Sequence, residues 1–219
     1  MRFDFQNNAF FRALSKFCDI VILNALFIIC SIPIITIGAS SSALYTVMLK
    51  FVRDEEGYIF KGFFLAFKEN FKKATIAWII ILLITMSLIV NISITIEMDI
   101  PWVRTAFLVA FSVIGLVLSF VWIYLFPLIA RYENPLKATF INALLLSVGR
   151  LPYTALLLLI HIVPVGLTLF VNVEILLMGI LAWLFFGFAS VAWFSSKILR
   201  KVFEVIEDAE DIEVNEEDE

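Results

Sequence analysis

Few side chains in this sequence are of the types that carry out chemistry, and their spacing excludes most kinds of active site. His161 is the single histidine, so a multi-histidine metal site cannot form. Cys18 and Cys30 lie twelve residues apart, which is neither a metal-binding nor a redox spacing. Glu97 and Asp99 share a short turn, where paired carboxylates are usually solvated. No hydrolase, phosphate-loop, zinc-protease or calcium-loop motif occurs, so we expect neither an enzyme nor a cofactor.

A second group of candidates surrounds a proline in the first long apolar stretch. Asn24 precedes Pro33, and Thr36 and Gly38 follow it. Proline removes a backbone donor and pushes the preceding Ile32 away from helical geometry, which predicts a broken helix. Broken helices at membrane depth hold ligands in many transporters, but they also occur as structural hairpins buried in protein. Both interpretations of this segment stay open from the sequence.

His161 and Pro164 form the third candidate. The proline leaves the carbonyl of Ile160 without its usual donor, and a neutral imidazole could bond to that carbonyl or to a neighbouring helix. The histidine is therefore either a polar group in a substrate pathway or a buried residue satisfied by its neighbours. Because no charged residue lies in the middle of any expected span, ion-coupled transport is disfavoured.

The composition identifies the environment in which these residues are placed. The chain of 219 residues is 62% hydrophobic, has a mean hydropathy of +1.01 and contains 23 phenylalanines, which excludes an ordinary soluble domain. We expect one all-α domain over residues 1–203, a polytopic membrane helix bundle of about five to six membrane segments. Residues 204–219 hold ten of the twenty acids and are predicted to form an acidic, partly disordered cytoplasmic tail.

The uncharged runs give the membrane segments. Residues 20–49 would form a helix of about 45 Å, longer than a hydrocarbon core of about 30 Å, so the break at Pro33 predicts a hairpin that returns. Whether residues 39–52 cross the membrane or form a re-entrant piece is left undecided. Four further spans are expected at residues 75–96, 105–130, 152–172 and 175–196.

Residues 58–74 have the pattern of an amphipathic helix. Its aromatic residues fall within an arc of roughly 100° and its lysines lie off that arc, which is typical of a helix at the membrane interface. Packing on the other helices outside the membrane is the alternative. The residues concerned are Phe60, Phe63, Phe64, Phe67 and Phe71 with Lys61, Lys68, Lys72 and Lys73. A second, shorter surface helix is expected within residues 1–16.

The basic residues predict the orientation. Before the acidic tail the chain has sixteen bases against ten acids, a net charge of +6, and the connections at 97–104 and 172–174 contain few of these bases. The base-rich ends of the spans should face the cytoplasm and meet anionic lipid headgroups rather than nucleic acid. An even number of crossings then places both termini inside the cell, in the plasma membrane. Five crossings with the N-terminus outside is the alternative.

Two segments resemble a known family. Asn24-Ala-Leu-Phe, Ser31-Ile-Pro33, Thr36-Ile-Gly38-Ala39 and Ala43-Leu-Tyr45, followed by Phe67-Lys68-Glu69-Asn70-Phe71-Lys72, are similar to the two signatures of YesL-like bacterial membrane proteins. The resemblance covers roughly residues 10–203. It implies an integral membrane protein of uncharacterised activity, often encoded beside carbohydrate ABC importers, and no catalytic residues.

The sequence therefore supports two hypotheses for the function. The first is an accessory protein that binds ABC importer subunits in carbohydrate uptake. The second is a small permease or channel for a neutral solute, with a pathway lined by Asn24, the segment from Pro33 to Gly38, and His161.

Overall fold

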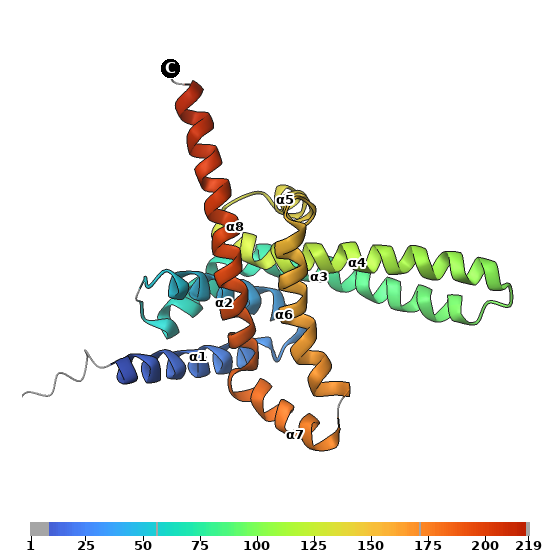
Figure 1. The fold of residues 1–219 in the computed structure, drawn as a ribbon, viewed down its shortest axis with the longest axis horizontal. Helices are drawn as coiled ribbons and strands as arrows, with labels where there is room; N and C mark the ends of the chain where they lie inside the picture. Colours follow the sequence, from blue (N-terminus) through green and yellow to red (C-terminus); the bar gives the residue numbers. More distant parts are fainter. Residues whose placement is uncertain (1–8, 56, 171, 218–219) are drawn as a thin grey trace, which may run out of the picture.

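The computed structural model describes residues 9–55, 57–170 and 172–217, and these residues form helices joined by short connections (Figure 1). The all-α prediction is confirmed, since no strand occurs in the described ranges. The helices in chain order are α1 (Ala9–Ser31), η2 (Ile34–Thr36), α2 (Ile37–Val52), α3 (Ile59–Ile96), α4 (Pro101–Arg131), α5 (Leu136–Gly149), α6 (Leu151–Phe170), α7 (Val173–Ala182), η3 (Trp183–Gly187) and α8 (Phe188–Glu217).

Six helical segments of the described chain are long and apolar enough to cross a membrane. They include Ala13–Ser31 and Ile34–Val52, so the return from the proline break is itself long enough for a crossing. The four later segments agree with the predicted spans, with α7, η3 and α8 counted as one. The protein is therefore an all-helical membrane protein with an N-terminal hairpin.

The break between α1 and α2 falls at the predicted proline. α1 ends at Ser31, Pro33 adopts an extended backbone, and a single 3₁₀ turn leads into α2 at Ile37. Gly38 follows this bend and lies in the first turn of α2. Its missing side chain lets α2 approach α3, because a Cβ at Gly38 would overlap the carbonyl oxygen of Ala74.

α2 is the centre of the bundle. It packs against α3, α4, α8 and α1, and most of its residues are buried. The chain between Gly38 and Leu49 contains small residues, Ala39, Ser40, Ser42 and Ala43, which allow this close packing on several sides. Residues 39–52, whose crossing of the membrane is left open by the sequence, therefore belong to the helix around which the others assemble.

α3 and α4 form a long antiparallel hairpin that projects from the bundle (Figure 1). The prediction of a separate helix over residues 58–74 was wrong in its boundary, because α3 is continuous from Ile59 to Ile96. At 38 residues it is about 57 Å long and exceeds the hydrocarbon core. Its buried residues lie mainly before Ile81 and those of α4 from Val121 onward, so the distal part of the hairpin is exposed on its outer faces.

The second half of the chain contains a further helix between two of its spans. Residues 136–149, between the spans expected at 105–130 and 152–172, form α5, which Figure 1 shows at the junction of α4 and α6. At the tail, the described backbone of α8 is helical as far as Glu217. The distal part of α8 extends away from the bundle in Figure 1.

Candidate functional site

Asn24 is fully buried and connects the first helix to the last. Its amide nitrogen donates to the carbonyl oxygens of Trp183 at 3.1 Å and Leu184 at 2.8 Å. Its side-chain oxygen accepts a bond from the backbone nitrogen of Ala189 at 3.0 Å. Three of its four hydrogen-bonding positions are thus occupied by the chain itself.

The partners of Asn24 belong to a local irregularity in the last span. Residues Trp183–Gly187 form one turn of π-helix between α7 and α8. A π turn widens the helix and frees backbone groups from their usual i to i−4 partners. Asn24 forms hydrogen bonds with two carbonyls of this turn and with the backbone amide of Ala189. This residue was expected to join helices or to bind a ligand, and the structure assigns it contacts of the first kind.

The backbone groups released at Pro33 are also bonded within the chain. The Thr36 hydroxyl lies 2.6 Å from the carbonyl oxygen of Cys30 and 2.7 Å from that of Pro33. The indole nitrogen of Trp78 in α3 donates to the carbonyl of Ile34 at 2.7 Å. The Pro33 carbonyl also accepts a bond from the backbone nitrogen of Thr36 at 2.9 Å, so all three carbonyls have partners within the chain. The break thus forms the turn of a hairpin, and Trp78 of α3 holds this turn in place.

His161 bonds to its own helix and to α2, and does not bond to the carbonyl freed by Pro164. Its Nδ1 lies 2.8 Å from the carbonyl oxygen of Leu157, so Nδ1 carries the proton and donates. Nε2 is then an acceptor, and the hydroxyl of Tyr45 donates to it over a long 3.4 Å. Trp122 of α4 packs edge-on against the imidazole at 5.6 Å between ring centres. The histidine thus joins α6 to α2 and α4.

Several buried hydroxyls near the bundle centre have no partner. Ser42 of α2 and Ser196 of α8 are fully buried, and their side-chain oxygens accept or donate no hydrogen bond to any described residue. A serine in a helix usually bonds to the carbonyl four residues earlier, as Ser40 does. An unbonded buried hydroxyl costs about 1–3 kcal/mol, so these two are polar groups available to water or a solute.

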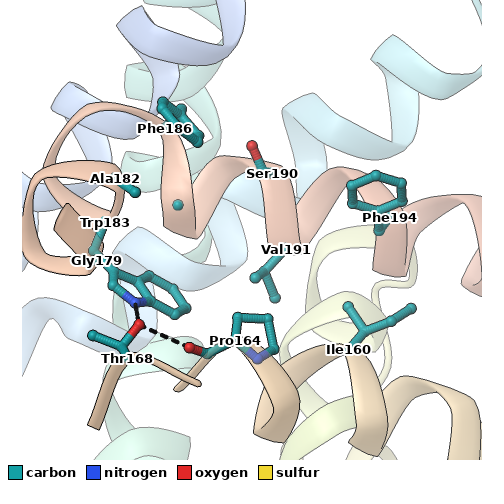
Figure 2. A pocket seen from close by; sticks show the side chains of 11 residues that line it. Ile160, Pro164, Thr168, Gly179, Ala182, Trp183, Phe186, Ser190, Val191 and Phe194 are labelled. Carbon is teal, nitrogen blue, oxygen red and sulfur yellow. Dashed lines mark hydrogen bonds between the residues drawn. The ribbon is translucent and has the colours of Figure 1, made fainter. Parts of the chain in front are cut away.

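A cavity of about 450 Å³ lies between α6 and the α7–η3–α8 segment, beside Pro164 (Figure 2). Trp183 donates to the Thr168 hydroxyl at 3.1 Å, and that hydroxyl donates to the Pro164 carbonyl at 2.8 Å. Figure 2 shows both bonds at one wall of the cavity. Apart from Thr168 and Ser190, the lining is apolar or aromatic. Such a lining suits a hydrocarbon group and lacks the convergent polar groups that a sugar requires.

The candidate residues are therefore not one site. Asn24 binds the π turn, Thr36 and Gly38 stabilise the hairpin, and His161 contacts Tyr45. Pro164 lies at the cavity wall. Sequence reasoning missed Tyr45 and Trp183, which look like ordinary core aromatics until their partners are known.

The aromatic stripe of α3 faces in two directions. Phe63 is fully buried and Phe67 is partly buried against the core, while Phe60, Phe64 and Phe71 are exposed by 62%, 41% and 41%. Each of the two alternatives for this segment therefore applies to some of its residues. Phe63 and Phe67 pack on the bundle, whereas Phe60, Phe64 and Phe71 face the surroundings. Lys61, Lys68 and Lys72 are exposed on the same helix.

Ion pairs gather at the base-rich end of the bundle. Arg131 holds Glu207 with three hydrogen bonds of 2.9–3.0 Å, and the Tyr132 hydroxyl donates to the same carboxylate at 2.9 Å. Arg200 of α8 donates to the carbonyl of Val52 at the end of α2. These contacts fix the start of the acidic tail against α4 and α2.

Comparison with known proteins gives one family match, over part of the chain. Residues 20–92 match the model of a family described as "Protein of unknown function, DUF624". This region covers the hairpin from α1 to α2 and most of α3, including Asn24, Pro33 and Gly38. No curated protein and no solved structure matches the chain.

Proposed function

We propose that this chain is a YesL-like, multi-pass protein of the plasma membrane that acts as an accessory component of carbohydrate uptake by binding ABC importer subunits. The matched family model and the two sequence signatures support the family assignment. The importer association comes from what the resemblance implies. In this proposal the protein has no enzymatic activity of its own.

One observation favours a binding role over transport. The polar residues that would line a pathway are used to hold helices together, since Asn24, Thr36 and His161 each bond to the chain. The cavity beside Pro164 is lined by apolar groups. A scaffold whose candidate pathway residues are used in this way is suited to presenting a surface to a partner.

The base-rich end offers such a surface. Lys61, Lys68 and Lys72 project from the first turns of α3, and none forms an ion pair with a described residue. Solvated lysines beside exposed Phe60 and Phe64 combine charge with apolar area, which is the usual composition of an interface rim and core.

The test is purification of the tagged, full-length protein from native membranes in a mild detergent, with identification of the co-purifying proteins. We expect a permease or ATPase subunit of a carbohydrate importer. The double variant Lys68→Gln, Lys72→Gln should recover less of it. Arg104→Gln, which removes a base at the opposite end of the bundle, is the matched control. Recovery of no importer subunit with the wild-type protein would contradict the proposal.

The alternative, a small permease for a neutral solute, is favoured by the unbonded hydroxyls of Ser42 and Ser196 near the Tyr45–His161 pair. Uptake of candidate sugars into proteoliposomes tests it directly. A permease should lose flux in Tyr45→Phe and His161→Gln while Trp102→Leu, exposed at the far end of α4, keeps it. Absence of flux in the wild-type protein would sink this alternative.

A further inference from the structure

A second cavity, of about 490 Å³, lies at the base-rich end between α1, the end of α2 and the start of α3. Its volume is within the range of about 300–1,000 Å³ that is usual for small-molecule sites. The walls combine apolar side chains, such as buried Val47 and partly buried Phe51, with charged groups of both signs. This mixture differs from the almost wholly apolar cavity beside Pro164.

Two of the ion pairs at this cavity are already formed. Lys16 of α1 reaches Asp54 at 2.7 Å, which links α1 to the loop between α2 and α3. Glu55 lies 3.8 Å from Arg53, which is outside the lining. Asp54 itself adopts a positive φ of 55°, which is uncommon for a residue other than glycine.

Three charged groups of the lining remain without a partner among the described residues. They are the ammonium groups of Lys50 and Lys61 and the partly buried carboxylate of Asp19. Two cations and one anion, placed on three different helices around one cavity, complement a ligand that carries a phosphate and an ammonium group. Basic pockets between membrane helices on the cytoplasmic side are recognised sites for lipid headgroups.

We propose that this cavity binds a phosphate ester bearing a primary ammonium group, as in the headgroup of an ethanolamine phospholipid. Lys50 and Lys61 bind the phosphate, and Asp19 accepts hydrogen bonds from the ammonium. Leu65 is 55% exposed at the cavity edge and offers an apolar path for the acyl chains. The proposal depends on the membrane location of the chain but not on importer binding.

The experiment measures binding of short-chain phospholipids to the purified, full-length protein in detergent. Phosphatidylethanolamine should bind about tenfold more tightly than phosphatidylglycerol, which lacks the ammonium, or phosphatidylcholine, whose quaternary nitrogen cannot donate a hydrogen bond. Asp19→Asn should abolish this preference. Lys50→Gln with Lys61→Gln should weaken all three lipids by about tenfold or more.

Arg104→Gln with Lys137→Gln serves as the matched control, since both bases are exposed outside the cavity and form no ion pair with a described residue, so binding should be unchanged. Melting temperatures without lipid verify that each variant is folded. Equal binding of the three lipids to the wild-type protein would overturn the proposal without any variant.

Free phosphoethanolamine, added as a competitor, distinguishes the source of the ligand. Competition at concentrations similar to those of the lipid supports a soluble phosphate ester, and no competition beside selective lipid binding supports a membrane lipid. Loss of selectivity in the control variant as well as in Asp19→Asn would contradict the assignment to this cavity.

Discussion

At the scale of the residue, a few polar side chains hold the irregular parts of the helices. Asn24 bonds to the π turn, Thr36 and Trp78 bond to the proline break, and Tyr45 bonds to His161. The sequence identified Asn24, Thr36 and His161 as noteworthy because polar groups are costly in a membrane. It could not identify their partners, which lie up to 165 residues away and exist only in the folded chain.

Asn24→Ala should destabilise the protein more than any comparable asparagine substitution. The change removes three hydrogen bonds and leaves backbone groups of the π turn unbonded in a buried position. We expect a loss of about 2 kcal/mol or more in the free energy of unfolding, measured by thermal or denaturant unfolding in detergent.

The control for this substitution is Asn91→Ala. The side chain of Asn91 is exposed and bonds only to Ser87 in its own helix, so its replacement should change stability by less than about 0.5 kcal/mol. Equal effects of the two substitutions would show that the bonds of Asn24 are not structurally important.

Gly38→Ala tests the close approach of α2 to α3. A Cβ at this position would meet the Ala74 carbonyl oxygen and the Trp78 Cβ, neither of which can rotate away, so the helices must separate. We expect a loss of about 1–3 kcal/mol, as is usual for overpacking. In Gly115→Ala the new methyl group meets nothing within 4 Å, and stability should stay the same or rise by up to about 1 kcal/mol.

At the scale of the element, the predicted spans agree with the structure because uncharged length is a direct sequence signal. The boundaries were less predictable. Nothing at Ala74 and Thr75 separates the amphipathic part of α3 from its membrane part, so one helix continues through both. The π turn at Trp183–Gly187 had no local signal either, since its freed backbone groups are stabilised by Asn24 of another helix.

The contact between α4 and the tail of α8 should depend on pH. Burial, together with the hydrogen bond to Glu207, raises the pKa of Tyr132 above its usual value of about 10. A raised folded-state pKa means that the neutral phenol is favoured by folding. Its contribution to stability is therefore fully present below about pH 10 and is lost as the pH rises through the folded-state value.

Melting temperatures of the wild type and Tyr132→Phe, measured in detergent between about pH 8 and 11.5, test this dependence. The difference between them should shrink above about pH 10, because the phenol of the unfolded wild type ionises there while the folded one stays neutral, which lowers the stability of the wild type only. A difference that stays constant over this range would show that the phenol proton does not contribute.

At the scale of the whole molecule, the number of membrane crossings decides which side of the membrane each surface of the protein faces. Six segments are long enough to cross, and the N-terminal hairpin accounts for two of them. The sequence left the second leg open because residues 39–52 alone are too short. The structure adds the 3₁₀ turn from Ile34, which lengthens the apolar leg to 19 residues, about 28 Å, and thereby matches the hydrocarbon core.

Six crossings require that the N-terminal end, the loop after α2 and the end of α8 lie on one side. We expect single cysteines at Ser15, Glu55 and Glu204 to be labelled from the cytoplasm, and those at Asp99 and Glu174 from outside, with Cys18 and Cys30 replaced. Labelling of Ser15→Cys from outside would mean five crossings. It would also separate Lys16 from Asp54, which an ion pair of 2.7 Å forbids, so this position tests the hairpin and the headgroup cavity together.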